Sequence, residues 1–161
     1  MDWYIIVLII LATFFFMEFV AWFTHKYVMH GFLWNLHKDH HIRDGRRFEW
    51  NDLFAVFFAA ISVILIFLGT RQGLDYRFWI GIGIFFYGVA YFLFHDVYVH
   101  KRVRIFNKLS NRYLRATVKA HLEHHTPHSH KNYGFLLAPL QYYMEEFRKS
   151  KRQNYTAEET V

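Results

Sequence analysis

Residues 3–23 read WYIIVLIILATFFFMEFVAWF, and only Thr13 and Glu18 interrupt this apolar run of 21 positions. Crossing the hydrocarbon core of a bilayer, about 30 Å, takes roughly 20 helical residues. The run therefore predicts a transmembrane helix. Two further apolar blocks of similar character follow, LFAVFFAAISVILIFL at 53–68 and FWIGIGIFFYGVAYFLF at 78–94. A soluble three-helix core is the alternative, but the block lengths favour a membrane.

Polar residues mark the ends of the second and third blocks. Asn51 and Asp52 precede the second block as candidate helix N-caps. The segment GTRQGLDYR at 69–77 separates the two blocks and predicts a tight turn, so we expect a helical hairpin. The sequence thus predicts an all-α integral membrane bundle with three to four transmembrane helices, the fourth being a short helix in the second half.

Composition sets the class of protein. The chain has 161 residues, 54% of them hydrophobic, and no cysteine. Disulfides, thiolate zinc sites and a cysteine nucleophile are therefore excluded. Because the apolar residues lie in long blocks, a nucleic-acid binder is disfavoured. We expect one domain over residues 1–147 and a flexible polar tail over 148–161.

The basic residues predict the orientation in the membrane. Residues 24–52 carry five Lys or Arg, residues 69–77 carry two and residues 95–161 carry twelve, so three spans place 17 of 19 on one side. Loops rich in Lys and Arg stay in the cytoplasm, which predicts a cytoplasmic location for the first and last of these segments in a bacterial inner membrane. The net charge of +6 also suits an acidic partner.

Twelve histidines are the unusual feature of the composition, and ten of them fall into two spacings that each occur twice. A predicted span ends in H-x-x-x-x-H, and H-x-x-H-H follows it. The boxes are His25 and His30; His37, His40 and His41; His95 and His100; and His121, His124 and His125. All lie on the predicted cytoplasmic side and form a histidine-rich cap. His128 and His130 follow Pro127 in a predicted loop, and we expect them to be structural or to contact a ligand histidine without binding metal.

Helical geometry indicates two metals. Positions i, i+3 and i+4 share a helix face, so each H-x-x-H-H directs three imidazoles to a similar place. Adjacent histidines diverge by about 100°, and an i, i+5 pair on a straight helix by about 140°, which suits two centres. Ten nitrogens also exceed the six ligands of one transition metal. We therefore expect all ten histidines to bind two ions, with no catalytic group beyond them.

The donor set favours iron. Zinc prefers four ligands, and copper would be expected to use fewer histidines or a sulfur ligand. HLEHH at 121–125 is only a near miss to H-E-x-x-H, and the Glu-x-x-His pairs of soluble di-iron bundles are missing from the boxes. We expect two iron ions that activate dioxygen, although zinc or another metal can replace iron in a purified sample.

Carboxylates near the boxes are candidates to orient the ligands. Glu18 lies seven residues before His25, inside a span, where an acid is a functional candidate. Asp96 adjoins His95 and is the second candidate. Asp39 and Glu123 are rivals of the same kind.

The order of the four boxes resembles that of the bacterial β-carotene 3-hydroxylases, within the fatty acid hydroxylase and sterol desaturase superfamily. The local sequences HKYVMHG at 25–31, FEWNDL at 48–53, His95-Asp96 and GFLLAP at 134–139 strengthen the resemblance, which covers about residues 15–140. It implies a monooxygenase that hydroxylates the β-ionone ring of carotenoids at C3, taking β-carotene through β-cryptoxanthin to zeaxanthin. It also implies dioxygen as co-substrate and a reduced ferredoxin-type donor.

Helix geometry, with the dinuclear sites of similar membrane desaturases, predicts how the ligands divide. Each i, i+3 pair should clamp one ion, while His40 and His41 should separate, as should His124 and His125. This gives one iron to His25, His37, His40, His121 and His124, and the other to His30, His41, His95, His100 and His125.

Two other functions stay open. Another lipid hydroxylase or desaturase of the same superfamily would use the same centre, because metal ligands do not specify the substrate. A histidine-rich membrane metal-binding protein is the second, but ion passage would require polar residues through the spans, where only Glu18 is acidic.

Overall fold

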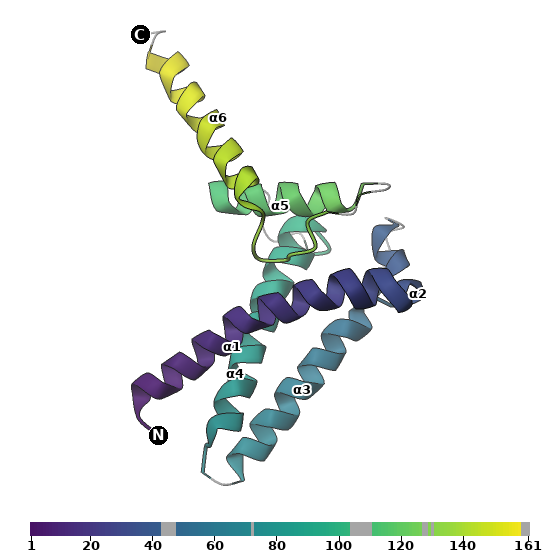
Figure 1. The fold of residues 1–161 in the computed structure, drawn as a ribbon, viewed down its shortest axis with the longest axis vertical. Helices are drawn as coiled ribbons and strands as arrows, with labels where there is room; N and C mark the ends of the chain where they lie inside the picture. Colours follow the sequence, from purple (N-terminus) through teal and green to yellow (C-terminus); the bar gives the residue numbers. More distant parts are fainter. Residues whose placement is uncertain (43–47, 72, 104–110, 127–128, 130, 159–161) are drawn as a thin grey trace. The chain divides into compact units, whose positions relative to one another are not determined.

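The computed structural model describes residues 1–42, 48–71, 73–103, 111–126, 129 and 131–158, with side chains described up to residue 149. Figure 1 shows the helices as they follow one another along the chain. In chain order, the described helices begin with α1 (Trp3–Phe23), η1 (Thr24–Phe32), α2 (Trp34–His37), η2 (Lys38–His41) and α3 (Asp52–Thr70). They continue with α4 (Tyr76–Tyr91), η3 (Phe92–Val99), α5 (Arg112–His124) and α6 (Leu140–Glu158).

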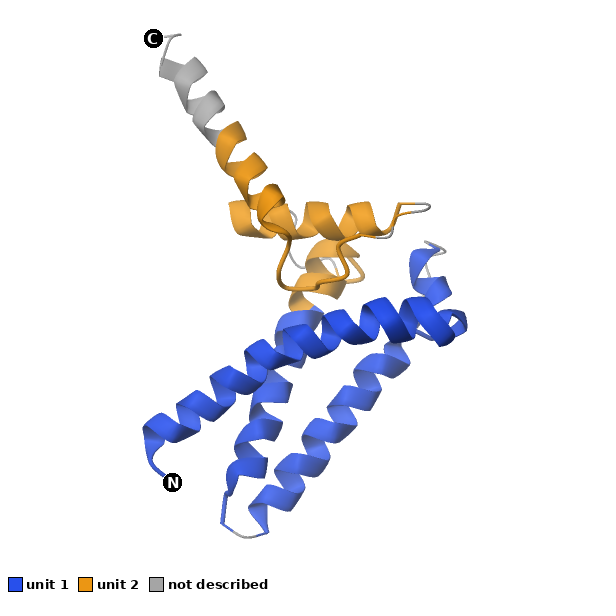
Figure 2. Cartoon of the chain, in the orientation of Figure 1, with its two compact units in different colours: residues 1–92 blue, residues 93–161 orange. Residues whose placement is uncertain are grey.

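The chain divides into two compact units, residues 1–92 and 93–161, which Figure 2 colours separately. Unit 1 holds α1 to α4, and unit 2 holds α5, α6 and nearly all of η3. A single functional domain over residues 1–147 stays a prediction.

The expectation of membrane helices is confirmed. Three helical stretches of the described chain are long and apolar enough to cross a bilayer: Trp3–Phe32, Asp52–Thr70 and Tyr76–Val99. Helix α5 has 13 residues, which is too short to span, and therefore does not provide a fourth crossing.

Small residues let α4 approach two neighbours within unit 1, where it packs against both α1 and α3 (Figure 1). A Cβ added at Gly81 would lie 2.8 Å from Ile66 Cγ1, and one at Gly83 would lie 2.6 Å from Thr13 Cβ. Residues two apart lie on nearly opposite helix faces, so Gly81 serves the α3 contact and Gly83 the α1 contact. Ser62 Oγ also donates to Gly81 O at 2.8 Å. Close backbone approach of this kind stabilises helix pairs in membranes.

The hairpin between α3 and α4 confirms the predicted turn and shows a cap that the sequence analysis did not assign. Asp75 accepts a hydrogen bond from Arg77 N at 2.9 Å and is the N-cap of α4. The Arg77 side chain also donates to Asp75, and this lowers the pKa of the Asp75 carboxyl. Gly73, with φ of 85°, supplies the left-handed conformation that the turn needs.

The ends of two spans are π-helical. Helix α1 continues as η1 and α4 continues as η3, and both continuations are π-helices. Their bonds run from residue i+5 to residue i, as in Leu33 N to Val28 O at 3.0 Å and His100 N to His95 O at 2.9 Å. These π-helices differ from the straight α-helices that the sequence predicts here, and they change which histidines share a helix face.

In unit 2, α5 packs against α6. Ala116 and Ala120 of α5 surround Tyr142 of α6, and Arg115 pairs with Glu146 at 2.8 Å. Residues 148–158 continue α6 as helix, and a flexible tail over 148–161 stays a prediction. Their Arg, Lys, Gln and Ala are good helix formers, and no Gly or Pro interrupts them.

Replacing Gly83 with Ala should lower the free energy of unfolding by about 1–3 kcal/mol, because the new methyl group must displace Thr13 on α1. Unfolding in detergent micelles measures the change. Gly88→Ala is the matched control, since its Cβ would meet nothing within 4 Å. Equal stability of the two variants would contradict the close α1–α4 contact.

Candidate metal centre

The first histidine box lies on a π-helix, and this brings its two members together. The His25 and His30 rings on η1 lie 5.0 Å apart between centroids. On an ordinary α-helix an i, i+5 pair would diverge by about 140°, which led us to expect that these residues flank two centres. With i→i+5 backbone bonding, residue i+5 lies almost above residue i. That expectation is therefore wrong for this box.

Two histidines of the second box join the first. His37 Nε2 lies 3.2 Å from His25 Nε2 and 3.2 Å from His41 Nε2. One nitrogen from each of His25, His30, His37 and His41 lies within 4.8 Å of the others, a spacing that suits a metal site. His25 and His37 are almost fully buried. Unit 1 thus gathers four imidazoles around one point.

Unit 2 builds a similar arrangement from the second pair of boxes. The His95 and His100 rings lie 4.5 Å apart, again on a π-helical segment and its end. Nitrogens of His95, His100 and His121 lie within 4.8 Å of one another. His125 Nε2 approaches His121 Nε2 at 3.0 Å.

The predicted division of ligands is wrong in its pairing. It separated His25 and His37 from His30 and His41, whereas the structure places these four together. The reason is the backbone. Besides the π-helices, residues 38–41 form a 3₁₀ helix, and here His37 and His41 lie together while His40 lies outside their group. The expected divergence of adjacent histidines is seen, because the ring planes of His40 and His41 are at 87°.

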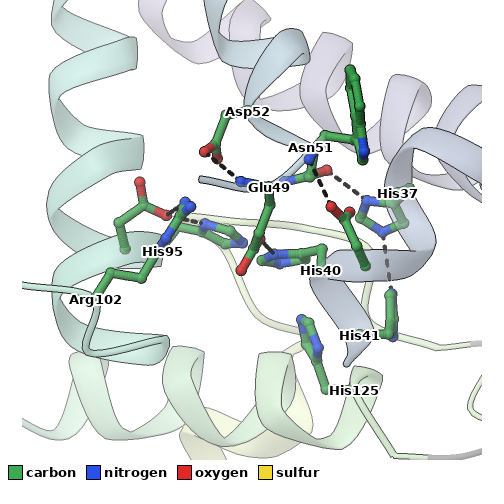
Figure 3. Close-up of polar contacts among 12 residues, drawn as sticks. His37, His40, His41, Glu49, Asn51, Asp52, His95, Arg102 and His125 are labelled. Carbon is green, nitrogen blue, oxygen red and sulfur yellow. Dashed lines mark hydrogen bonds and ion pairs between the residues drawn. The ribbon is translucent and has the colours of Figure 1, made fainter. Parts of the chain in front are cut away.

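Oxygen acceptors hold the Nδ1 atoms of two histidines in unit 1, as Figure 3 shows. His37 Nδ1 donates to Asn51 Oδ1 at 2.7 Å, and His40 Nδ1 donates to Glu49 Oε2 at 2.7 Å. Asn51 thus binds a histidine and makes no side-chain cap of α3, contrary to expectation. The carboxylate of Asp39 accepts from Trp50 N at 2.7 Å and anchors the segment that carries both acceptors.

Two histidines of unit 2 are held in the same way. His95 Nδ1 donates to Asp96 Oδ1 at 2.9 Å, and Arg102 lies 3.6 Å from the same oxygen. His124 Nδ1 donates to the backbone oxygen of Lys131 at 2.8 Å.

These contacts determine the tautomer of each ring. A carboxylate, an amide oxygen or a carbonyl oxygen can only accept, so the proton must lie on Nδ1 and Nε2 carries the lone pair. Neutral imidazoles fixed in this manner are the usual ligands of iron, zinc and copper. The buried donor set therefore fits a transition metal.

The other sequence candidates contact different groups. Glu18 is buried and accepts from the Tyr87 hydroxyl at 2.8 Å, which links α1 to α4. Glu123 accepts from the Tyr142 hydroxyl at 2.5 Å. Support of a ligand histidine by Glu18 stays a prediction. His128 and His130 lie outside the described residues.

Glu49 and Asn51 are the site residues that the sequence analysis missed. They lie in FEWNDL, a motif used for the resemblance but assigned no role at the metals. Their position just before an apolar block looked like helix capping. The sequence signal that could have identified them is their position. A carboxylate and an amide lie two residues apart, between the second histidine box and the apolar block at 53–68, on the predicted side of the membrane that carries the histidines.

Comparisons with known proteins agree on one family. Residues 10–145 match the family model described as fatty acid hydroxylase. The chain is 42% identical over 135 residues to a β-carotene hydroxylase of Pantoea ananas, covering 82% of this chain and 77% of the relative. A β-carotene hydroxylase of Paracoccus sp. (strain PC1) is 37% identical over 82% of this chain and 83% of its own length. The chloroplastic β-carotene 3-hydroxylase 2 of Arabidopsis thaliana is 38% identical over 76% of this chain and 42% of its own length. No solved structure shows significant similarity to the chain.

Replacing Glu49 with Ala should weaken metal binding by about 10- to 100-fold, because the His40 ring loses the acceptor that orients it. Glu49→Gln keeps an acceptor oxygen and should lose less. Iron titration of the purified apoprotein measures the affinity. The control is Glu145→Gln on the exposed face of α6, which should bind iron like the unmodified chain. Unchanged affinity in Glu49→Ala would show that Glu49 does not support a ligand.

Proposed function

Because this chain belongs to the fatty acid hydroxylase family, we propose that it is a membrane oxygenase that hydroxylates the β-ionone rings of carotenoids at C3. The substrate would be β-carotene, converted through β-cryptoxanthin to zeaxanthin. The observation that carries this proposal is the combination of two features. The chain gathers buried imidazoles at the ends of apolar helices, and it is similar to β-carotene hydroxylases over most of its length.

Two iron ions are the proposed cofactors. Within unit 1, His25, His30, His37 and His41 lie together, and within unit 2, His95, His100 and His121 lie together. Ten histidines in four boxes exceed the coordination of a single ion. The ten proposed ligands are His25, His30, His37, His40, His41, His95, His100, His121, His124 and His125. When bound, the irons would supply activation of dioxygen, one atom of which enters an unactivated C–H bond while the other leaves as water.

The protein's own part is to hold and orient the ligands. Asn51, Glu49, Asp96 and the Lys131 carbonyl fix Nδ1 protons on four rings, so that each Nε2 lone pair is available. Because these rings are held before any metal arrives, little reorganisation is needed when it binds. Asp96 is thus the proposed support for His95, and Glu18 for a ligand at the end of α1.

The substrate reaches the site from the bilayer. The first and third histidine boxes lie at the ends of the spans α1–η1 and α4–η3, and a carotenoid dissolves in the same hydrocarbon. Each hydroxylation needs two electrons and two protons in addition to dioxygen. The sequence has no G-x-G-x-x-G nucleotide fingerprint, so we propose a reduced ferredoxin-type donor.

The location follows from charge. Since 17 of 19 basic residues fall on one side of a three-span topology, we place the metal centre on the cytoplasmic side of a bacterial inner membrane.

A different lipid hydroxylase or desaturase is the second candidate, and the family model's description favours it, since it refers to fatty acids. The imidazole sets would serve either substrate equally. Product analysis separates the two.

Expression in cells that accumulate β-carotene should yield β-cryptoxanthin and then zeaxanthin, identified by chromatography and mass spectrometry. His121→Ala is the control, because it should insert into the membrane but remove a buried nitrogen from the unit 2 set. Unchanged β-carotene in iron-replete membranes that contain the protein would overturn the carotenoid assignment. Hydroxylated or desaturated acyl chains in those cells would support the second candidate.

Turnover with reduced ferredoxin should slow several-fold as ionic strength rises from about 0.01 to 0.15 M, because salt shortens the Debye length from roughly 30 to 8 Å. The basic residues of segments 24–52 and 95–161 attract an acidic carrier only over distances up to about the Debye length. An uncharged chemical reductant is the control and should show no such dependence. Salt-independent turnover with ferredoxin would contradict electrostatic docking.

A further inference from the structure

Tyr142 is a buried residue whose hydroxyl makes two short hydrogen bonds. Its side chain, on α6, is only 2% exposed. The hydroxyl donates to Glu123 Oε2 at 2.5 Å and accepts from Asn132 Nδ2 at 2.6 Å. The same amide nitrogen donates to the Ala120 carbonyl at 3.2 Å. Asn132 is thus tied to both helices of unit 2.

The backbone of Asn132 adopts an uncommon conformation. Its φ is +61°, in the left-handed region that only Gly and, less often, Asn or Asp adopt readily. The residue before it, Lys131, presents the carbonyl that accepts from His124 Nδ1. The conformation at Asn132 therefore helps to set the direction of the oxygen that orients this histidine.

The segment that follows Asn132 packs directly on histidines of the same unit. The Tyr133 ring lies 4.9 Å from the His124 ring, and the Phe135 ring lies 5.4 Å from His95 and 5.8 Å from His121. A shift of this segment would disturb the orientation of more than one imidazole.

We propose that Tyr142 is a positioning residue for His124: it secures Asn132, and Asn132 holds the Lys131 carbonyl against His124 Nδ1. The inference rests on the proposed role of His124 as a metal ligand.

The chemistry of the hydroxyl suits this role. Burial, followed by the hydrogen bond to Glu123, raises the pKa of Tyr142, so the group stays protonated and continues to donate at neutral pH. Loss of the oxygen would remove one anchor of Asn132 and leave the Lys131 carbonyl less restrained. The His124 ring would then lose the fixed direction of its Nε2 lone pair, and metal affinity would fall.

The test compares Tyr142→Phe with Tyr143→Phe in the full-length protein, using Co²⁺ as a spectroscopic probe of imidazole ligation. Tyr143 is the neighbouring tyrosine, and its hydroxyl contacts Ala138 N at 2.9 Å. In Tyr142→Phe, we expect the Co²⁺ affinity of the sites that use His124 to fall about tenfold or more, with altered d–d absorption. The Co²⁺ affinity of the other sites and the helical content should be unchanged. Tyr143→Phe should bind Co²⁺ like the unmodified chain.

Asn132 provides the second variant pair. Asn132→Gly accepts a positive φ without strain, whereas Asn132→Ala does not, so Gly should retain more Co²⁺ affinity than Ala.

Wild-type affinity in Tyr142→Phe would overturn the proposal, as would equal weakening of both classes of sites with loss of helical content. If the unmodified chain binds no Co²⁺, both the metal-site proposal and this inference fail. Unchanged Co²⁺ binding in Tyr142→Phe would remove this inference alone.

Discussion

The hydrogen bond from a histidine Nδ1–H to a fixed oxygen is the interaction on which the proposed metal centre depends. It places the proton on one ring nitrogen, exposes the lone pair of the other and fixes the ring plane. Among the described residues, such acceptors include Glu49, Asn51, Asp96 and the Lys131 carbonyl. Each acceptor must itself be held, which explains why Asp39 binds the backbone at Trp50. The surrounding polar network therefore serves ring orientation.

The two halves of the chain reach similar local geometry with different backbones. In each half, a span becomes π-helical at its H-x-x-x-x-H box. In the box that follows, the Nε2 atoms of an i, i+4 pair lie close together, 3.2 Å apart for His37 and His41 and 3.0 Å apart for His121 and His125. In unit 1 that pair lies on α2 and a 3₁₀ helix, whereas in unit 2 it lies at the end of α5. The π-helix is the shared element, because it converts an i, i+5 spacing into a common face.

The sequence predicts the fold well because membrane spans depend on length and hydropathy, which are local properties. It also predicts which histidines gather, since the repeated spacings concern residue type alone. It does not predict their pairing, because no residue in THKYVMHGF or FLFHDVYV signals a π-helix in preference to an α-helix. Nor does it predict the acceptors. Asn51 is 14 residues from His37, and Lys131 acts through a backbone atom that its side chain does not reveal.

The acceptors also determine where negative charge lies. The gathered nitrogens are neutral donors, so a divalent or trivalent ion brought among buried imidazoles would be electrostatically costly without nearby anions. Each unit contributes one carboxylate behind a histidine, Glu49 behind His40 and Asp96 behind His95, and one neutral acceptor, Asn51 or the Lys131 carbonyl. Among the described residues, these two carboxylates can compensate part of the charge of a bound ion from behind the rings. Arg102, 3.6 Å from Asp96, partly offsets the charge of that carboxylate.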